Sequence, residues 1–257
     1  MNNEKYLDHI THHRQRFDAH VAVLAASAVA SIFGKNIATG GENIPAEGPV
    51  ILAANHISHA DTVLLNSYVY LHHRVPNILV KDGLMKAPVI GTFMRGIHAL
   101  PVARGQGSGN QPTLDTALRI LDRGDAVMIY PEGGTGRGED FWPARGKMGL
   151  GYIALNSDAP VVPIAQWGAQ DIMSRGDDGK QHVSLWPLRK PMRYNIGEPM
   201  SFARDIEEDG VTEGRKLAPE QIVTDAVMHR ITEQLGVIRG EEPQGYYAEK
   251  APDSTTA

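Results

Sequence analysis

The chain has 257 residues, of which 42% are hydrophobic and 21% charged, with a formal net charge of −5. This length suits one large α/β domain with an appendage, or at most two small domains. The absence of cysteine excludes disulfides, thiolate metal sites and a cysteine nucleophile. The negative net charge gives no reason to expect a nucleic-acid partner, and any contact with an anionic membrane must rely on local patches.

The first 34 residues have the pattern of a helix that is polar up to Asp18 and apolar afterwards. The apolar part, residues 21–33, is shorter than the roughly 20 residues that span a bilayer, so no transmembrane segment is predicted. The long polar stretch before it is not typical of a signal peptide. The apolar part either contacts a membrane surface or packs on the rest of the protein, and the sequence leaves both open.

After a break over residues 38–45, short apolar runs alternate with helical patterns. The alternation predicts an α/β fold with a central mixed sheet flanked by helices and an N-terminal helical appendage. We predict a helical segment over residues 1–36, a main domain over 37–239 and a disordered tail over 240–257. Strands are predicted over 49–54, 77–81, 98–103, 125–130, 160–165, 183–188 and 192–197, and helices over 58–71, 88–94, 113–123, 146–156 and 219–235.

His56 and Asp61 follow the first predicted buried strand with a spacing that suits general-base catalysis. A hydroxyl that attacks a thioester must lose its proton, and histidine is the usual base near neutral pH. The other ring nitrogen needs an acceptor that fixes the tautomer, and a nearby aspartate supplies one. Asp61 falls in the first turn of the helix that begins near Ser58, from where it can fold back toward His56.

The spacing is not specific by itself, because a chain with 11 histidines should contain about one His-x-x-x-x-Asp match by chance. His13 and Asp18 form a second match, which lies in a polar helical stretch with no strand before it. We interpret that pair as a solvated helix face. Asp61 also has a structural interpretation, because Ser58-His59-Ala60-Asp61 resembles a capping box with Asp in place of Glu.

Three further segments follow in order along the chain. Arg104 comes just after the strand at 98–103, a loop with the sequence Tyr-Pro-Glu-Gly-Gly-Thr-Gly-Arg covers residues 130–137, and a proline-containing strand covers 161–164. Together with residues 55–61, these segments resemble the 1-acylglycerol-3-phosphate acyltransferase family, which includes lysophosphatidate and other glycerophospholipid acyltransferases. The first segment agrees with that family's Asn-His-x-Ser-x-x-Asp pattern at every specified position, and the resemblance extends over roughly residues 40 to 200.

The resemblance implies that His56 is the general base and that Asp61 orients it. It also implies that Arg104 and the loop with Glu132 and Gly133 bind the phosphate end of the acyl acceptor. A guanidinium matches phosphate bidentately and stays charged at any relevant pH. Because an acid beside a phosphate is electrostatically unfavourable, we expect Glu132 to hold a basic residue or to accept backbone N–H groups.

Arg137 and Lys147 are further substrate-binding candidates, whereas Arg145 is equally well explained as a solvated surface residue. The family usually has threonine directly after Glu-Gly, but this chain has Gly134 and then Thr135, so we do not assign the threonine to the site. The fourth segment, with Val162 and Pro163, is either structural or part of the acyl-donor site.

The implied activity is transfer of a fatty acyl group from an acyl thioester, acyl-CoA or acyl carrier protein, to the free hydroxyl of 1-acyl-sn-glycerol-3-phosphate. The product would be phosphatidic acid, an intermediate of phospholipid biosynthesis. Alternative acceptors are glycerol-3-phosphate and another lysophospholipid or glycolipid, and a non-catalytic lipid-binding protein is an alternative of another class. The resemblance implies a peripheral contact on the cytoplasmic side of the cell membrane, with no metal, prosthetic group or nucleic acid.

Other candidate sites are weaker. His9, His12 and His13 have helical spacing, but no carboxylate is clearly placed as a third metal ligand. Neither glycine-rich loop ends in the Gly-Lys-Ser/Thr of a phosphate-binding P-loop. Ser108 does not lie in the Gly-x-Ser-x-Gly pattern of a serine esterase.

Overall fold

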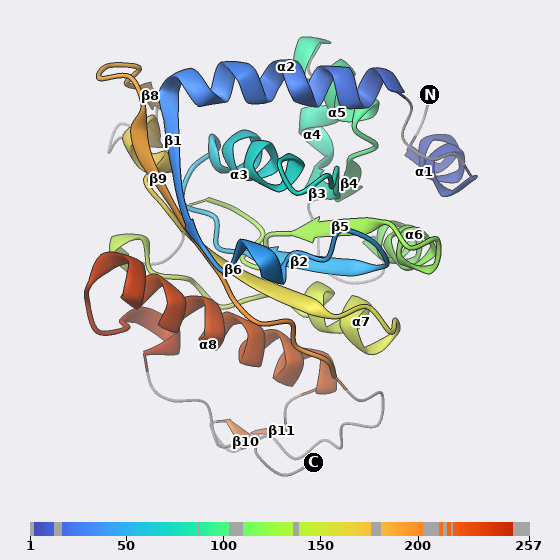
Figure 1. Cartoon of the computed structure of the whole chain (residues 1–257). Coiled ribbons are helices and arrows are strands. Elements are labelled where there is room, and N and C mark those ends of the chain that lie inside the picture. Colours follow the sequence, from blue (N-terminus) through green and yellow to red (C-terminus); the bar gives the residue numbers. More distant parts are fainter. Residues whose placement is uncertain are drawn as a thin grey trace.

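The computed structural model of the protein is shown in Figure 1. It describes residues 3–12, 17–86, 88–102, 110–135, 139–175, 181–202, 211–212, 215–216 and 218–248. His13, Arg104, Ser108 and Arg137 lie outside these ranges.

A mixed sheet of seven strands forms the centre of the fold, in the order β1-β9-β6-β2-β5-β3-β4. The five strands from β6 to β4 run parallel to one another, whereas β9 is antiparallel to β6 and parallel to β1. The predicted central mixed sheet is therefore confirmed. The strands are β1 (Gly34–Thr39), β2 (Val50–Ala54), β3 (Asn77–Lys81), β4 (Leu100–Val102), β5 (Ala126–Ile129), β6 (Val161–Trp167) and β9 (Lys190–Ile196).

Helices cover both faces of the sheet, with α2 and α3 on one face and α7 and α8 on the other (Figure 1). The helices are α1 (Asn3–His12), α2 (Phe17–Phe33), α3 (Asp61–Tyr70), α4 (Asp82–Met85), α5 (Pro88–Gly96), α6 (Gln111–Asp122), α7 (Gly149–Leu155) and α8 (Pro219–Arg239). The smaller elements are η1 (Gly41–Asn43), η3 (Glu139–Phe141), η4 (Ala169–Asp171), η5 (Gly245–Tyr247) and the hairpins β7 (Met173–Arg175) with β8 (Gln181–Val183) and β10 (Val211–Thr212) with β11 (Arg215–Lys216).

The central strands are short and apolar because both of their faces are covered. Every residue of β2 and β5 is buried, which is the pattern of parallel strands enclosed between helices. Helices connect these strands, so the strands point the same way and their carboxyl ends meet at one edge of the sheet. The residues that follow β2, β5 and β6 are therefore brought together.

Two segments differ from the sequence prediction. β1 was not predicted, because residues 34–39 have no apolar alternation and only the first of them is buried. Residues 183–188 were predicted as a strand, but β8 ends at Val183 and an exposed loop follows. A proline in that segment, Pro187, has no N–H to donate to a neighbouring strand.

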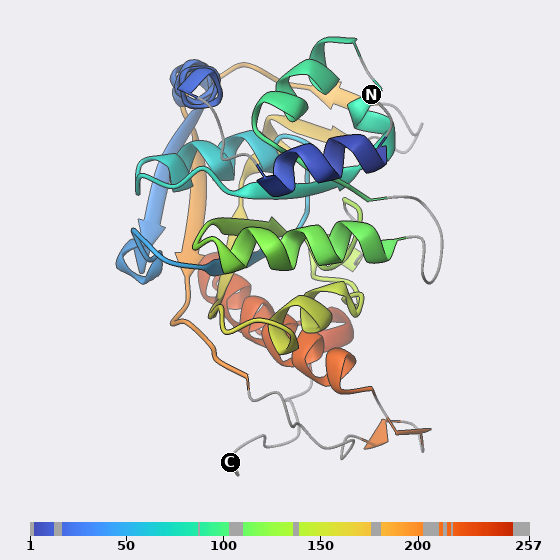
Figure 2. The same ribbon diagram turned by 90° about the vertical axis from the view of Figure 1, so that its right-hand side faces the viewer.

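The N-terminal region forms two helices rather than one, and both pack on the domain. In α1, the Tyr6 hydroxyl donates to the carbonyl of Ala99 at 3.0 Å, and Ile10 accepts a hydrogen bond from Arg123 at 2.8 Å. In α2, one side lies over α3 (Figures 1 and 2). In the described part of the chain, no helix combines the length and apolarity that crossing a membrane requires.

The start of the tail is packed rather than disordered as predicted. The hydroxyl of Tyr247, a residue 2% exposed, donates to Asp225 at 2.7 Å and accepts the N–H of Gly146 at 2.9 Å. This correction applies to residues 240–248, since residues 249–257 lie outside the described ranges.

Candidate active site

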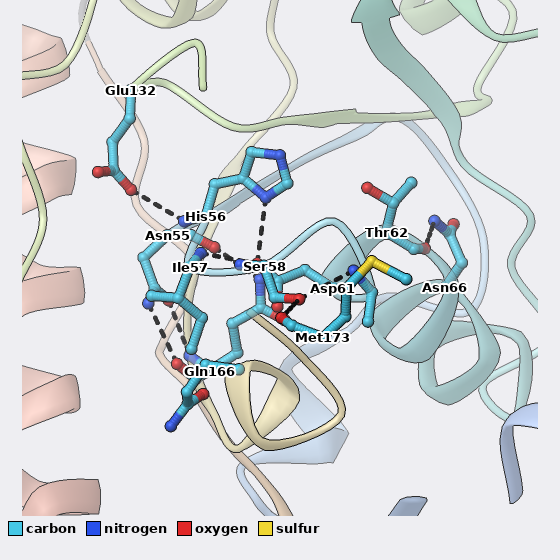
Figure 3. Close-up of polar contacts among 12 residues, drawn as sticks. Asn55, His56, Ile57, Ser58, Asp61, Thr62, Asn66, Glu132, Gln166 and Met173 are labelled. Atoms are coloured by element: carbon cyan, nitrogen blue, oxygen red, sulfur yellow. Dashed lines mark hydrogen bonds and ion pairs between the residues drawn. The ribbon is translucent and has the colours of Figure 1, made fainter. Parts of the chain in front are cut away.

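His56 and Asp61 lie together at the carboxyl end of β2, in the loop that leads into α3 (Figure 3). The His56 Nδ1 atom is 3.1 Å from Asp61 Oδ2, and the two side chains are 13% and 0% exposed. With Nδ1 carrying the proton donated to Asp61, Nε2 of the same ring points away from the carboxylate and can accept a proton (Figure 3).

The Asp61 carboxylate is also held by the backbone of its own loop. Its Oδ2 atom accepts the N–H of Ile57 at 2.7 Å and the N–H of Ser58 at 2.8 Å. The bond to Ser58 lies within the loop, because α3 begins at Asp61 with Ala60 as its N-cap residue and Ser58 is not the N-cap residue that the sequence predicted. Hydrogen bonds to an ionised acceptor are stronger than neutral ones, so these contacts fix the carboxylate relative to the His56 ring.

The ring of Tyr130 packs against the imidazole of His56. The two ring centroids are 4.3 Å apart and the planes are inclined by 26°. Burial raises the pKa of Tyr130 well above its usual value, and the negative charge of Asp61 raises it further. The Tyr130 hydroxyl therefore stays protonated, and its ring forms a neutral wall on one side of the base.

Asn55 and Gln166 join the ends of β2 and β6 directly beside the base (Figure 3). The Asn55 side chain donates to the Gln166 carbonyl at 3.1 Å and accepts the Gln166 N–H at 2.8 Å. The side-chain amide of Gln166 in turn donates to the backbone carbonyl of Asn55 at 2.6 Å. Both residues are almost fully buried, so this exchange fixes the backbone from which His56 projects.

Glu132 connects the loop after β5 to two other segments of the site. Its Oε1 atom accepts the N–H of His56 at 2.9 Å, and its Oε2 atom accepts the N–H of Ala144 at 2.9 Å. The side chain is 3% exposed. These contacts agree with the expectation that Glu132 accepts backbone N–H groups and positions the loop.

Gly133 and Lys147, predicted separately as substrate-binding residues, lie against each other. Gly133 has φ +68°, and a β-carbon on it would come within 2.7 Å of Lys147 Nζ. A side chain at this position would therefore displace the end of the lysine side chain, and the positive φ would strain the backbone. Lys147 is exposed, so its ammonium group can meet an anion at the surface of the loop.

Other sequence candidates are placed as follows. Arg145 lies over the ring of Tyr246, with its guanidinium carbon 5.5 Å from the ring centroid. Val162 and Pro163 lie near the start of β6, buried beside β2, which agrees with the structural interpretation of the fourth segment and leaves the acyl-donor interpretation a prediction. Arg104 and Arg137 fall outside the described residues, so their predicted roles stay predictions.

The structure adds Tyr130 and Gln166 to the residues that sequence reasoning assigned to the site. Tyr130 was visible as an aromatic residue directly before Pro-Glu-Gly, but nothing in the sequence indicated a stack on His56. Gln166 is 111 positions from Asn55, and the only available signal was a polar residue at the end of an apolar strand.

Ser58 links the base loop to the β7–β8 hairpin. Its hydroxyl donates to the Met173 carbonyl at 2.6 Å and accepts the N–H of Ala60 at 3.0 Å. Within the described residues, no group of three or more His, Asp or Glu side chains is arranged to hold a metal ion. The arrangement as a whole holds the His56 imidazole against a buried carboxylate with fixed backbone around both, which is the geometry that a general base needs.

Comparisons with known proteins give a consistent result. The model of a family described as Acyltransferase matches residues 36–167. The chloroplastic 1-acyl-sn-glycerol-3-phosphate acyltransferase BAT2 of Brassica napus is 29% identical over 168 residues, which are 65% of this chain and 47% of that protein. The 1-acyl-sn-glycerol-3-phosphate acyltransferase of Bacillus subtilis is 30% identical over 162 residues, 63% of this chain and 72% of that protein. The chain thus spans less than half the length of the plant relative.

The same architecture is found in a solved structure, the 1-acyl-sn-glycerophosphate (LPA) acyltransferase PlsC from Thermotoga maritima. The two chains superimpose with a TM-score of 0.62 over 92% of this chain and 88% of the other, at 17% sequence identity. At this identity the likeness shows a shared fold.

Proposed function

The chain belongs to the acyltransferase family, and from this premise we propose that it transfers a fatty acyl group from an acyl thioester to the free hydroxyl of 1-acyl-sn-glycerol-3-phosphate. The product of this reaction is phosphatidic acid, and the second product is the free thiol of coenzyme A or of acyl carrier protein. The observation that carries the proposal is the oriented His56–Asp61 pair, because an enzyme of this class needs a base for its acceptor hydroxyl.

The proposed reaction begins when Nε2 of His56 removes the proton from the acceptor hydroxyl. The alkoxide oxygen attacks the thioester carbon, and the tetrahedral intermediate breaks the carbon–sulfur bond to release a thiolate. The thiolate takes the proton back from the imidazolium, so that the base is regenerated and no metal or prosthetic group is required. Asp61 stabilises the imidazolium between these two proton transfers.

The oxyanion of the tetrahedral intermediate needs donors outside the base loop. The N–H groups of His56, Ile57 and Ser58 are already donated to the carboxylates of Glu132 and Asp61. These three groups hold the catalytic residues in place. Stabilisation of the oxyanion is usually a large contribution in acyl transfer, and we propose that other groups of the protein provide it.

We assign the phosphate end of the acceptor to the loop after β5. Lys147 lies on Gly133 in that loop and presents an exposed ammonium group. Arg104 and Arg137 are proposed as further phosphate ligands on the strength of the sequence resemblance. A fixed phosphate would hold the acceptor so that its hydroxyl meets His56, which is a positioning effect.

The proposed location is peripheral, at the cytoplasmic side of the cell membrane, because the acceptor is a lipid. α2 supports this proposal, since it packs on α3 (Figure 1) and still leaves Val21, Leu24 and Ile32 about half exposed. The two interpretations of this helix, packing on the domain and contact with a membrane, are therefore compatible.

The proposal is tested by acyl transfer from labelled acyl-CoA and acyl carrier protein to a panel of acceptors. The panel contains 1-acyl-sn-glycerol-3-phosphate, glycerol-3-phosphate, lysophosphatidylcholine and water alone. We expect transfer to the first acceptor, and a loss of about 10²–10⁴-fold in rate for His56→Ala. His13→Ala is the matched control, since His13 has the same spacing to an aspartate, and it should keep full activity.

Each contrary outcome indicates a different function. Undiminished transfer by His56→Ala would overturn the mechanism. Release of free fatty acid that does not depend on an acceptor would indicate a hydrolase. Binding of labelled 1-acyl-sn-glycerol-3-phosphate without transfer from either donor would indicate a lipid-binding protein.

A further inference from the structure

The last residue of β8 and the loop that follows it expose a run of large apolar side chains. Val183 is 55%, Leu185 47%, Trp186 78% and Leu188 47% exposed. Trp186 is the most exposed large apolar side chain in the described part of the chain. Single exposed apolar residues are normal in folded proteins, but contiguous ones mark sites of interaction. We call residues 183–188 the apolar loop.

The apolar loop is held firmly at its base. The buried Lys190 donates its ammonium group to the carbonyl and hydroxyl of Ser184, at 2.7 and 3.0 Å, and to the carbonyl of Asp171. The N–H of Ser184 donates to the Ile172 carbonyl at 2.8 Å. Lys190 is 8% exposed as a residue. A charged group is costly to bury without such partners, so these hydrogen bonds hold the base of the loop in place.

The apolar loop adjoins the exposed side of α2. The N–H of Arg189 donates to the carbonyl of Ile32 at 3.1 Å, which fixes the end of the loop beside the last turn of the helix. On α2, Val21 is 49%, Leu24 56% and Ile32 49% exposed. Figures 1 and 2 both place α2 and the orange segment after β8 at the same end of the molecule.

Two exposed cations border this surface, with the exposed Asp171 near the base of the loop, although the whole chain carries −5. Residues 181–197 contain no aspartate or glutamate. Lys35 and Arg189, at the ends of the helix and the loop, are both exposed. Cations bordering an apolar surface match an anionic bilayer, where each one near the surface adds about 1 kcal/mol of attraction.

The same hairpin contacts the candidate active site. Met173 of β7 accepts the Ser58 hydroxyl and pairs with Val183 of β8 in the hairpin register. A bilayer that contacts the apolar loop is therefore connected by one short hairpin to the loop that carries His56.

From these observations we propose that the apolar loop and the exposed side of α2 form one membrane-contact surface, which inserts into the outer part of an anionic phospholipid bilayer with Trp186 at the headgroup level. Indole has an apolar body and one N–H donor, a combination that favours this interfacial depth. The choice of a lipid partner rests on the proposed function, while the surface itself rests on exposure, anchoring and charge.

The test is sedimentation of the full chain with vesicles of phosphatidylcholine that contain about 30 mol% phosphatidylglycerol. We expect Trp186→Ser to weaken vesicle partitioning about tenfold, since burial of one large side chain is lost. Val237→Ser is the matched control, because Val237 is 75% exposed but lies on α8, on the opposite face of the sheet. Circular dichroism verifies that both variants are folded.

A second readout follows the indole itself. Brominated lipids in the vesicles should quench part of the tryptophan emission of the wild type. This quenched part should be missing in Trp186→Phe. Partitioning that is equal for wild type, Trp186→Ser and Val237→Ser would overturn the proposal. A dimer of the wild-type chain would also overturn the proposal if Trp186→Ser dissociated it and vesicles did not. The surface would then bind a second copy of the chain.

Activity measurements separate this proposal from the proposed function. We expect Trp186→Ser to transfer acyl groups normally to a dispersed short-chain acceptor and more slowly to an acceptor embedded in vesicles. A chain that partitions in a Trp186-dependent way but shows no transfer to any acceptor would support the surface and contradict the proposed function. If the wild type is active on both acceptors and Trp186→Ser partitions as the wild type does, the proposed function is supported and the proposed surface is contradicted.

Discussion

Oδ2 of Asp61 accepts three hydrogen bonds, from the His56 ring and from the N–H groups of Ile57 and Ser58. The sequence left two interpretations of this residue, a helix cap and the orienting partner of a base. In the structure α3 begins at Asp61 with Ala60 as its N-cap residue and without a side-chain cap, so Ser58 is not the N-cap residue of a capping box. The N–H groups of the preceding loop hold the carboxylate in the position from which it contacts the imidazole.

Tyr130 packs against His56, the proposed base, and its replacement should affect the rate more than substrate binding. A stacked aromatic pair is worth about 0.5–1.5 kcal/mol beyond the area that it buries. We therefore expect Tyr130→Ala to lower kcat about 3- to 10-fold, with little change in KM for the acceptor. Tyr130→Phe keeps the ring and should keep most of the rate. Steady-state kinetics at several acceptor concentrations distinguish the two parameters.

The opposite pattern would show that the stack is not important for catalysis. If Tyr130→Ala raised KM without lowering kcat, Tyr130 would be a substrate contact rather than a positioning residue. If Tyr130→Phe were as slow as Tyr130→Ala, the hydroxyl rather than the ring would be the important group.

Arg239, at the C-terminal end of α8, contacts the segment over residues 140–144, which also contacts the candidate site. The Arg239 guanidinium lies between two indole rings, 4.4 Å from the centroid of Trp142 and 4.5 Å from that of Trp167. It also donates to the carbonyl of Asp140 at 2.7 Å. Asp140 and Trp142 precede Ala144, whose N–H is bound by Glu132, so the helix end supports a segment that contacts the site.

We expect Arg239→Ala to lower the free energy of unfolding by about 2 kcal/mol, because two cation–π contacts of about 0.5–2 kcal/mol each are lost together with packing. Arg239→Lys keeps the charge but not the plane that stacks between the rings, so its loss should be intermediate. Urea unfolding measures both effects.

The matched control for this prediction is Arg230→Ala. Arg230 lies on the same helix, is about half exposed and forms an ion pair with Glu233 at 3.2 Å. An exposed pair of this kind contributes less than about 1 kcal/mol. Equal destabilisation in Arg239→Ala and Arg230→Ala would show that the stacked arrangement adds nothing.

Elements with a periodic or continuous apolar pattern were predictable, and elements that depend on a distant partner were not. β2 and β5 are short apolar runs bounded by turn residues, and both are strands within a residue or two of the prediction. β1 exposes five of its six residues and exists because it pairs with β9, a strand more than 150 positions away. The packing of Tyr247 also depends on contacts with distant residues.

The same distinction applies to the site. The local motif at residues 55–61 was sufficient to predict the pairing of His56 with Asp61, since the chain folds back over five positions. The stack of Tyr130 on His56 and the exchange between Asn55 and Gln166 depend on sheet order, which the sequence alone did not specify.

At the scale of the whole molecule, two partly buried histidines should make stability depend on pH. Burial lowers the pKa of His72, and the nearby His73 lowers it further, against the opposing charge of Glu42. Burial also lowers the pKa of His229, although Asp225 and Glu233 act in the opposite direction. The folded state therefore binds protons at these two positions less readily than the unfolded state, whose histidines titrate near pH 6.5.

Because the unfolded state binds more protons, stability rises with pH and falls as the solution is acidified. This contribution is fully present above about pH 6.5 and is lost as the pH falls through the unfolded and then the lower folded pKa values. Unfolding by guanidinium at several values between about pH 7.5 and about pH 5.5 measures the slope. We expect the double variant His72→Gln/His229→Gln to have a shallower slope than the wild type, because neither glutamine takes up a proton. An unchanged slope, or a steeper one, would show that these two histidines do not control acid stability.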